Sequence, residues 1–311
     1  MQYLDVTIRE SVFLSKPMDE YKALQYLKYY CEHMPFEEIK YVEIGFLDNI
    51  GEGLLCYNEE YALQAYNILQ QKFKMVGMIH PAKVDLKKWK KEVIQKFDLV
   101  RICLGNTIDE HTEKIIQYLK ANGVEVSLNI IYIGNKTQEY IMQCITLAKK
   151  FGVDWICLAD SNGSCTPDDI KCIVSKLKME KVPSKLGIHI HDHFSMAMAT
   201  ALHCYEDLDM LDVSVTGVGK GGGNLCLEKM ILCRSKIDNK EIVSDSILAY
   251  IQLVVYLHTK ALCIDNAYEE QIKNLLVAYY KCNLKAVEEI ETLASNNFDV
   301  FCKCICERGR I

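Results

Sequence analysis

Eight short apolar segments recur along residues 1–241 of the 311-residue chain, and they constrain its fold more than any other feature. Each segment is almost continuously hydrophobic rather than alternating, which is typical of strands buried on both faces of a parallel sheet. The stretches between them place apolar residues three and four positions apart, which predicts helices. The predicted strands are 3–8, 41–46, 74–79, 99–104, 124–132, 154–159, 185–191 and 211–217.

Eight strand–helix units in one chain favour an α/β fold of the (β/α)8, or TIM-barrel, type. An open doubly wound sheet is the alternative, but no glycine-rich nucleotide fingerprint follows the first strand. We therefore assign 1–241 to a catalytic barrel. Residues 242–311 are predicted to form a small helical extension with helices over 244–262, 267–282 and 284–295.

Composition narrows the function classes. The net charge of −6 and the lack of a basic stripe argue against a nucleic-acid partner. The apolar run 247–257 is too short to span a bilayer, and the N-terminus resembles a strand rather than an export leader. Fifteen cysteines, mostly in apolar runs, indicate reduced thiols in a cytoplasmic protein. Cys302, Cys304 and Cys306 are interpreted as a cysteine-rich tail, with a soft-metal site as the less favoured alternative.

Polar residues gather where the predicted strands end, which is where barrel enzymes carry their chemistry. His189 and His191 are two residues apart on a strand, so both side chains point to one side. With Glu10 they could hold a divalent cation, although a structural histidine pair is the alternative. The Gly-dense loop 216–228 is either a tight turn or a close approach that brings Asn224 to the metal. The other polar residues at or just after the strand ends are Arg9, Glu43, Asp48, Asn49, His80, Arg101, Asn129, Tyr132, Asp160, Ser161, Asn162 and Lys220.

Five motifs, in chain order, resemble those of the HMG-CoA lyase-like enzymes, also called DRE-TIM metallolyases. They are "LDVTIRES" (4–11), "YVEIGF" (41–46), "LADSNGSCTPDDI" (158–170), "HIHDH" (189–193) and "TGVGKGGGNLCLE" (216–228). Within that group the chain is most similar to proteins of the 4-hydroxy-2-oxovalerate aldolase type. The resemblance implies that His189 and His191 bind a metal, with Asn224 as a further ligand. It also implies that Arg9 stabilises an enolate and that Glu43 orients Arg9.

The chain departs from the family pattern at three positions near its start. Glu10 stands where the family has a metal-binding aspartate, and Ser11 where it has glycine. Phe13 replaces the histidine of the aldolases, and a phenylalanine cannot move a proton. The candidates for a replacement base are His80, His193, Tyr132 and a C-terminal tyrosine; among them we assign His80 a catalytic role.

We therefore expect a metal-dependent aldolase or lyase that cleaves or forms a C–C bond through a metal-bound enolate of a 2-oxoacid such as pyruvate. A ligand set of imidazole and oxygen favours Mn²⁺ or Mg²⁺, with Zn²⁺ as an alternative. The predicted substrate-binding residues are Arg101, Asn129, Asp160 and Lys220, and the partner is a small 2-oxoacid or aldehyde. The alternatives are a Claisen-type acyl-CoA condensing transferase and a repurposed barrel that acts as a binding protein. Assembly into a homo-oligomer is left open.

Overall fold

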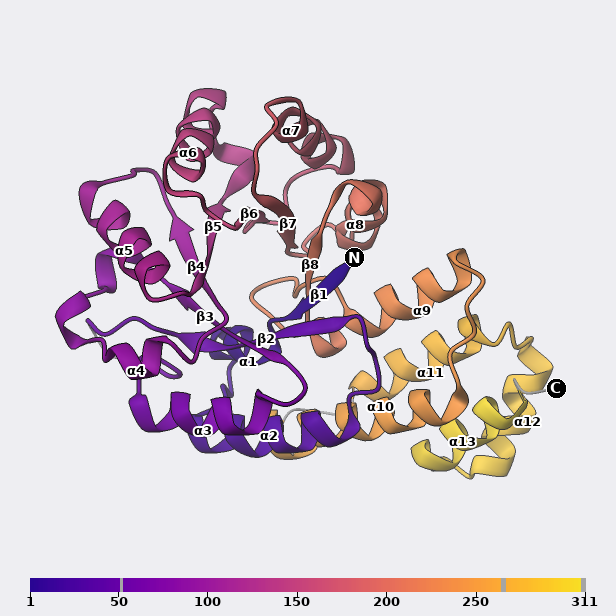
Figure 1. Ribbon diagram of the computed structural model, residues 1–311. Helices are drawn as coiled ribbons and strands as arrows, with labels where there is room; N and C mark the ends of the chain where they lie inside the picture. The colour runs from indigo at the N-terminus through magenta and orange to yellow at the C-terminus, as the bar shows by residue number, and fades with distance from the viewer. Residues whose placement is uncertain (51–52, 264–266, 309–311) are drawn as a thin grey trace.

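The computed structural model describes residues 1–50, 53–263 and 267–308, and its centre is a closed barrel of eight parallel strands (Figure 1). The strands neighbour one another in chain order, and β1 pairs with β8 to close the ring. This arrangement confirms the predicted (β/α)8 barrel. The strands are β1 Gln2–Asp5, β2 Ile39–Phe46, β3 Lys74–Ile79, β4 Leu99–Leu104, β5 Glu125–Ile131, β6 Trp155–Asp160, β7 Lys185–Ile190 and β8 Met210–Val213.

Helices surround the barrel, and several begin at a side chain that accepts a hydrogen bond from the first turn. Thr166 and Asp169 form a reciprocal capping box, with Pro167 at the first helical position as predicted. The outer helices are α2 Glu20–His33, α3 Glu59–Leu69, α4 Lys91–Ile94, α5 Glu110–Ala121, α6 Gln138–Phe151, α7 Pro167–Met179, α8 Ala197–Cys204 and α9 Leu227–Ile237, with short 3-10 turns η2 Pro81–Lys83, η3 Leu86–Lys88, η4 Ile133–Asn135 and η5 Tyr205–Asp207.

Two strands, β1 and β8, end three and four residues earlier than predicted, and both differences shape the site. β1 stops at Asp5, whose Oδ1 accepts a hydrogen bond from the Thr7 backbone N–H (2.7 Å). The chain then turns through α1 Thr7–Glu10 and η1 Ser11–Phe13, so Arg9 and Glu10 lie on a helical turn rather than on a strand. β8 stops at Val213 and is followed by η6 Val215–Gly217.

The barrel interior is layered. An apolar floor is formed by Leu4, Val6, Tyr41, Val76, Leu99, Trp155 and Met210. Two positions after Tyr41, Leu99 and Met210 of this floor lie the buried charged residues Glu43, Arg101 and Asp212. Since the side chains of a strand alternate, these residues share the inward face with the floor. The sequence thus places a charged layer directly under the mouth of the barrel.

The C-terminal extension packs beside the barrel, next to α2 and α9 (Figure 1). It consists of α10 Ser244–Tyr256, the π-helical η7 Leu257–Leu262, α11 Ala267–Tyr279, α12 Leu284–Ala294 and α13 Phe298–Arg308. Tyr256 stacks on Tyr29 of α2, with ring centroids 4.2 Å apart. The helix α13 corrects the predicted tail, because Cys302 and Cys306 are buried on it. Residues 309–311 of the predicted extension lie outside the described residues, and the boundary at 241/242 stays a prediction.

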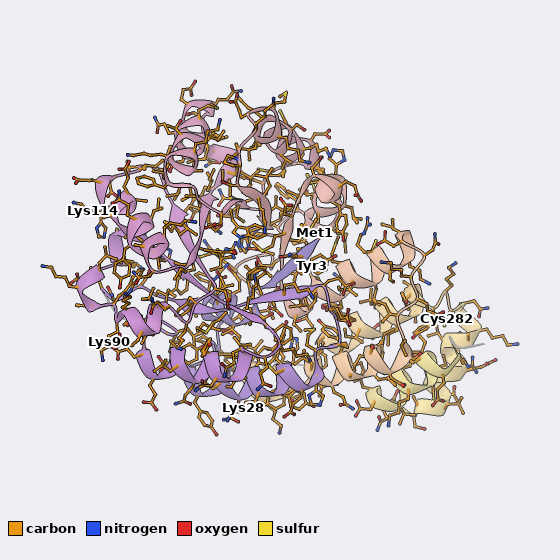
Figure 2. All side chains as sticks on the ribbon, viewed as in Figure 1. Met1, Tyr3, Lys28, Lys90, Lys114 and Cys282 are labelled. Atoms are coloured by element: carbon orange, nitrogen blue, oxygen red, sulfur yellow. The ribbon has the colours of Figure 1, made fainter. Side chains whose placement is uncertain are left out.

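The described helices include none that is long and apolar enough to cross a membrane. Charged side chains such as those of Lys28, Lys90 and Lys114 instead project outward from the ring of helices (Figure 2). The described residues contain no disulfide. The apolar residues of the barrel wall and of the extension belong to one contiguous buried cluster.

Candidate metal centre

Glu10, His189 and His191 converge at the mouth of the barrel, and all three are buried. One ligand atom from each lies within 4.8 Å of the others. The two imidazole Nε2 atoms are 3.4 Å apart, and His189 Nε2 is 3.9 Å from Glu10 Oε1. His189 lies on β7, His191 directly follows this strand, and the carboxylate comes from α1. Two imidazoles and a carboxylate at this spacing are suitable ligands for a divalent cation.

The outer nitrogens of both histidines are held in place. His189 Nδ1 lies 2.9 Å from Asp212 Oδ2, and His191 Nδ1 lies 3.2 Å from each of the carbonyl oxygens of Lys220 and Gly223. These acceptors place the proton on Nδ1 and leave the Nε2 lone pairs for a ligand. Burial lowers the pKa of His189, and burial together with His189 and Arg9 lowers the pKa of His191 to about 3. Both rings are therefore neutral near pH 7.

Asn224 adds an oxygen that has no partner. Its Nδ2 donates to the carbonyl oxygen of Val218 (2.8 Å), whereas its buried Oδ1 accepts no hydrogen bond. Asn224 also forms a backbone bridge with His191. An unsatisfied buried carbonyl oxygen is costly, and a cation would satisfy it. The donor set of Glu10, His189, His191 and Asn224 therefore fits a divalent metal.

The loop between β8 and α9 reaches this centre because it lacks side chains at key positions. A Cβ atom on Gly219 would lie 2.1 Å from Asn224 Nδ2 and 2.9 Å from Glu10 Oε2. The backbone N–H of Lys220 donates to Glu10 Oε2 (3.2 Å). Glycine at 219 therefore permits the close approach that one reading of the Gly-dense loop predicts.

A chain of buried charges lies beneath the metal centre. Arg9 Nε donates to Glu43 Oε2 (2.7 Å), and Arg9 Nη1 contacts Glu10. Arg101 Nη1 donates to Glu43 Oε1 (3.2 Å), and Arg101 Nη2 contacts Asp212. Three carboxylates against two guanidinium groups leave one net negative charge, which favours a bound cation. Arg9 Nη2 is buried without a partner and is free to donate to a ligand.

A cavity of about 120 Å³ opens in front of this centre. Arg9, Glu10, His189 and His191 line one end, and Asn129 and Lys220 also border it. Arg101 and Asp160 do not line it, which does not support their predicted contact with substrate. Arg101 is fully buried and is bound to its carboxylate partners in the barrel interior. Asp160 accepts hydrogen bonds from the backbone N–H groups of Ser164 (3.1 Å) and Cys165 (2.9 Å).

The candidates for a proton-transfer group differ in whether they line the cavity. His80 and Tyr132 line the cavity, together with Phe13 at its mouth. His193 is not a lining residue; a Cβ atom on Gly221 would lie 2.2 Å from its Nε2, so the glycine loop packs against it. The tyrosines of the described C-terminal helices do not border the cavity either.

His80 is oriented by Asp48, a residue to which sequence reasoning assigned no role. Asp48 Oδ2 lies 2.8 Å from His80 Nδ1, and Asp48 Oδ1 accepts from the His80 backbone N–H (2.8 Å). The hydrogen bond to Asp48, followed by that to Cys103, raises the pKa of His80 to about 9. Asp212 was missed altogether. The available signal was an acidic residue inside an apolar strand, where only a buried cation would tolerate it.

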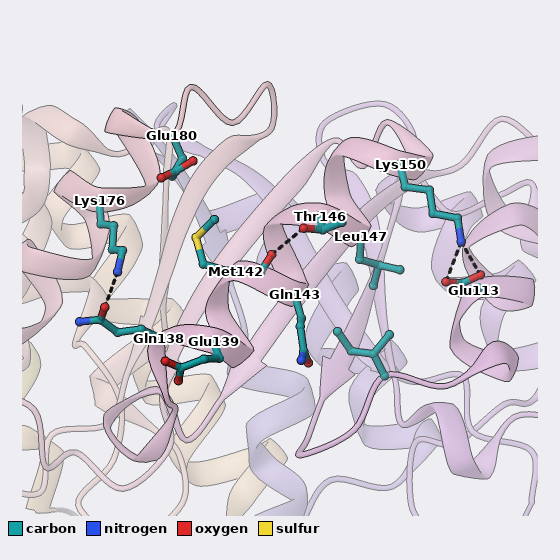
Figure 3. Close-up of a pocket in the computed structure, with 11 residues that line it drawn as sticks. Glu113, Gln138, Glu139, Met142, Gln143, Thr146, Leu147, Lys150, Lys176 and Glu180 are labelled. Carbon is teal, nitrogen blue, oxygen red and sulfur yellow. Dashed lines mark hydrogen bonds and ion pairs between the residues drawn. The ribbon is translucent and has the colours of Figure 1, made fainter.

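A second, larger hollow of about 1000 Å³ lies on the outer helices α5, α6 and α7 (Figure 3). Both of its lysines are bound to neighbouring side chains. Lys150 Nζ pairs with Glu113 Oε2 (2.8 Å), and Lys176 Nζ donates to Gln138 Oε1 (2.8 Å). Because its polar groups do not converge on a common point, we place the chemistry in the smaller cavity at the strand ends.

The chain is similar to known proteins over part of its length. Residues 101–248 match the family described as HMGL-like. An oxaloacetate decarboxylase of Mycobacterium tuberculosis is 26% identical over 62% of this chain and 58% of its own length. A 4-hydroxy-2-oxovalerate aldolase of Thermus thermophilus is 24% identical over 60% of this chain and 56% of its own length. The chain thus spans less than two thirds of these curated relatives.

Solved structures with low sequence identity share the fold. The N-terminal domain of a putative aldolase from Bacteroides vulgatus superposes with a TM-score of 0.70 at 18% identity, covering 93% of this chain and 99% of that one. An HMG-CoA lyase from Acinetobacter baumannii, solved with coenzyme A and 3-methylmalate, gives a TM-score of 0.65 at 16% identity, covering 85% of this chain and 92% of that one.

Proposed function

We propose that this chain, which carries an HMGL-like domain in residues 101–248, is a divalent-metal-dependent lyase that cleaves or forms a carbon–carbon bond next to the carbonyl group of a 2-oxoacid. The observation that carries the proposal is the convergence of Glu10, His189 and His191 in a cavity that also exposes an unpartnered donor of Arg9. The relatives described above are a decarboxylase and an aldolase by name, which supports the same reaction class.

The metal ligands in this proposal are Glu10, His189, His191 and Asn224. When bound, a divalent cation polarises a substrate carbonyl and stabilises the negative charge that develops on its oxygen. The oxygen and imidazole donors suit Mn²⁺ or Mg²⁺, with Zn²⁺ as the alternative. Asp212 holds the His189 ring in place through Nδ1, so that it faces the centre without rearranging.

Arg9 supplies the second source of positive charge. Its Nε is held by Glu43, and its free Nη2 donates to the substrate oxygen that gains charge. Because the guanidinium is fixed before the substrate arrives, little reorganisation is needed during the reaction. Lys220 and Asn129, at the border of the cavity, bind the rest of the substrate in this proposal.

Phe13 occupies the position of the family's catalytic histidine, and in this proposal His80 takes over the proton transfer. Asp48 fixes His80 Nδ1, so the proton that can be transferred lies on Nε2. A pKa of about 9 keeps the ring protonated near neutral pH. In this state His80 acts as a general acid, which returns a proton to the carbon from which the bond has been broken.

A second candidate reaction follows from the same observation. Cleavage of an aldol needs a base to remove a hydroxyl proton, whereas loss of carbon dioxide from a 2-oxo-dicarboxylate needs only an acid to protonate the product. A cavity with a protonated His80 and with phenylalanine at position 13 favours decarboxylation. The oxaloacetate decarboxylase among the relatives supports this candidate.

The test combines metal content with turnover. We expect the purified protein, after incubation with Mn²⁺ and desalting, to hold about one metal ion per chain by mass spectrometry, and to release pyruvate from a 4-hydroxy-2-oxoacid or from oxaloacetate. The variant His189→Ala/His191→Ala is expected to lose both properties.

The matched control is His111→Ala/His203→Ala, which removes two histidines of the outer helices and is expected to keep both properties. Background decarboxylation by free Mn²⁺ is measured with the His189→Ala/His191→Ala variant. A parent protein that binds no metal at millimolar Mn²⁺ would contradict the proposal.

A further inference from the structure

The cavity in front of the metal centre has an apolar end, to which the lyase proposal assigns no part of the substrate. This apolar end is lined by Phe13, Phe46, Met78, Ile131 and Tyr132. Phe46 and Met78 belong to one buried contact cluster, against which Ile131 packs. Met78 lies on β3, which is across the closed barrel from β7 and its metal-binding histidine. The cavity therefore runs from the metal centre to an apolar wall on the other side of the barrel mouth.

Two aromatic rings of the apolar end are only partly covered by the protein. Phe13 is 48% exposed and Tyr132 is 38% exposed, although both line the cavity. Tyr132 also has a left-handed backbone, with φ at 55°, which is costly for a bulky residue and is concentrated at ligand sites. Since burial of apolar surface is favourable, a ligand with an apolar group would be stabilised by covering these rings.

The fixed positive charges lie at the other end of the cavity. Among the described residues that line it, the lysine and arginine side chains are those of Arg9 and Lys220. Arg9 contacts Glu10, and the backbone N–H of Lys220 donates to the same carboxylate (3.2 Å). The carboxylate and carbonyl oxygens of a 2-oxoacid are therefore expected at the metal centre, and the rest of the molecule points towards the apolar end.

His80 is the one charged group in the wall of the apolar end when it is protonated. Its ring stacks on Phe46, with centroids 5.2 Å apart and planes 22° from parallel. Asp48 Oδ2 lies 2.8 Å from His80 Nδ1, so a positive charge on this ring is already balanced. A second substrate carboxylate at the apolar end would lose its hydration without gaining an unpaired cation, which is unfavourable.

We propose that the 2-oxoacid formed or consumed by this enzyme carries a short apolar chain, which lies against the apolar end of the cavity. The inference rests on the lyase proposal and narrows its substrate class; it applies to both candidate reactions, because each involves a 2-oxoacid. The cavity of about 120 Å³ is well below the roughly 300 Å³ of a site for a drug-sized ligand, so the chain has only a few carbon atoms.

The experiment measures the affinity of the full chain, loaded with Mn²⁺, for a series of 2-oxoacids by calorimetric titration. We expect the Kd to fall about fourfold for each added methylene, and at least tenfold in all from pyruvate to 2-oxohexanoate. 2-Oxoadipate has as many carbon atoms as 2-oxohexanoate but ends in a second carboxylate. It is expected to bind at least tenfold more weakly than 2-oxohexanoate.

Phe13→Ser tests the position of the chain without disturbing the buried core. We expect the ratio of the pyruvate Kd to the 2-oxohexanoate Kd to fall about fivefold, whereas a purely structural role of Phe13 would change the melting temperature and not this ratio. Phe194→Ser is the matched control, because Phe194 is 65% exposed and does not line the cavity. It is expected to keep the ratio of the parent protein.

The outcomes separate this inference from the lyase proposal. Equal Kd values for pyruvate and 2-oxohexanoate, or tighter binding of 2-oxoadipate than of 2-oxohexanoate, would overturn the apolar chain and leave the lyase proposal standing. An unchanged ratio in Phe13→Ser would overturn the apolar end as the place of the chain. Metal content is measured on the same sample. A protein that holds Mn²⁺ but binds none of these acids would overturn both.

Discussion

Asp212 connects the buried charged layer to the metal centre. Its Oδ2 contacts Arg101 Nη2 and also lies 2.9 Å from His189 Nδ1, so one atom serves both the charged layer and the metal centre. Burial alone would raise the pKa of Asp212, but the interactions with Arg101 and His189 outweigh it and lower the pKa. The carboxylate is thus ionised throughout the neutral range and balances part of the positive charge of Arg101.

Asp212→Asn tests this dependence. The amide preserves the shape but removes the charge, so we expect a loss of about 3 kcal/mol in the free energy of unfolding and a 10- to 100-fold weaker affinity for Mn²⁺. Urea unfolding and calorimetric titration measure the two effects. Asp207→Asn is the matched control, since Asp207 also contacts two cations, Lys171 and Lys178, but near the surface. It is expected to cost less than about 1 kcal/mol. Unchanged metal affinity in Asp212→Asn would contradict the assignment.

Asp5, at the end of β1, contributes a stabilisation that is present in acid and is lost towards neutral pH. Burial raises its pKa to about 6, against 3.8 for an unperturbed aspartate. The folded protein therefore keeps a proton that the unfolded chain releases, so the stabilisation is complete below about pH 4 and is lost as the pH rises to about 6. This difference in pKa corresponds to roughly 3 kcal/mol.

Asp5→Asn keeps an oxygen for the Thr7 N–H but cannot ionise. We expect the variant to be more stable than the parent at pH 7, by roughly 2 to 3 kcal/mol, and to lose this advantage at pH 4. Chemical unfolding at the two pH values gives the comparison. A stability difference that is the same at pH 4 and pH 7 would show that Asp5 does not titrate in this range.

At the scale of elements, the loop from β8 to α9 determines whether the metal ligands meet. Gly219→Ala would force its Cβ against Asn224 and Glu10, so we expect at least a tenfold loss of Mn²⁺ affinity with little change in melting temperature. Gly105→Ala is the control, because a Cβ there meets nothing within 4 Å. Metal affinity is measured by titration. Equal affinities of the two variants would mean that the loop moves without disturbing the ligands.

The elements also show what the sequence could and could not predict. The eight strands were located correctly because strands buried on both faces form continuous apolar runs. The turn that carries Arg9 and Glu10 was not predicted, because the apolar residues Val6 and Ile8 resemble a continued strand. The hydrogen bond from the Thr7 N–H to Asp5, which accompanies the turn, is not visible in the sequence pattern. Helix α13 was missed because three cysteines resembled a tail rather than the apolar face of a helix.

The sequence predicted the residues of the candidate site that lie in local motifs, but not the ion pairs between distant strands. Motif spacing identified Glu10, His189, His191 and Asn224, which the fold brings to one end of the barrel. Motif spacing could not reveal that the positive charge of Arg101 is paired with Asp212. The two residues are 111 positions apart in the sequence but in contact in the barrel interior. Interior pairings of this kind follow from barrel closure, which a local pattern does not encode.

At the scale of the whole molecule, the barrel and the extension share a contiguous apolar core, from α2 through α10 to α13. Tyr29 and Tyr256 stack across the junction, and Ser244 of α10 donates to the carbonyl oxygen of Cys306 on α13 (3.1 Å). A core without a break favours one cooperative unfolding transition over two independent ones. The two tryptophans of the chain, Trp89 and Trp155, both lie in the barrel, so their fluorescence reports on that part alone.

The variant Phe301→Ala distinguishes a single cooperative unfolding transition from two independent ones. Phe301 is buried on α13, far along the chain from both tryptophans, and its truncation should cost about 3 to 5 kcal/mol. If the molecule unfolds as one unit, tryptophan fluorescence and far-ultraviolet circular dichroism will show the same lowered midpoint. Val300→Ala, at an exposed neighbouring position, is expected to leave both midpoints nearly unchanged. A fluorescence midpoint that stays at the parent value, while circular dichroism reports an earlier loss of helix, would show that the extension is a separate domain and would support the boundary at 241/242.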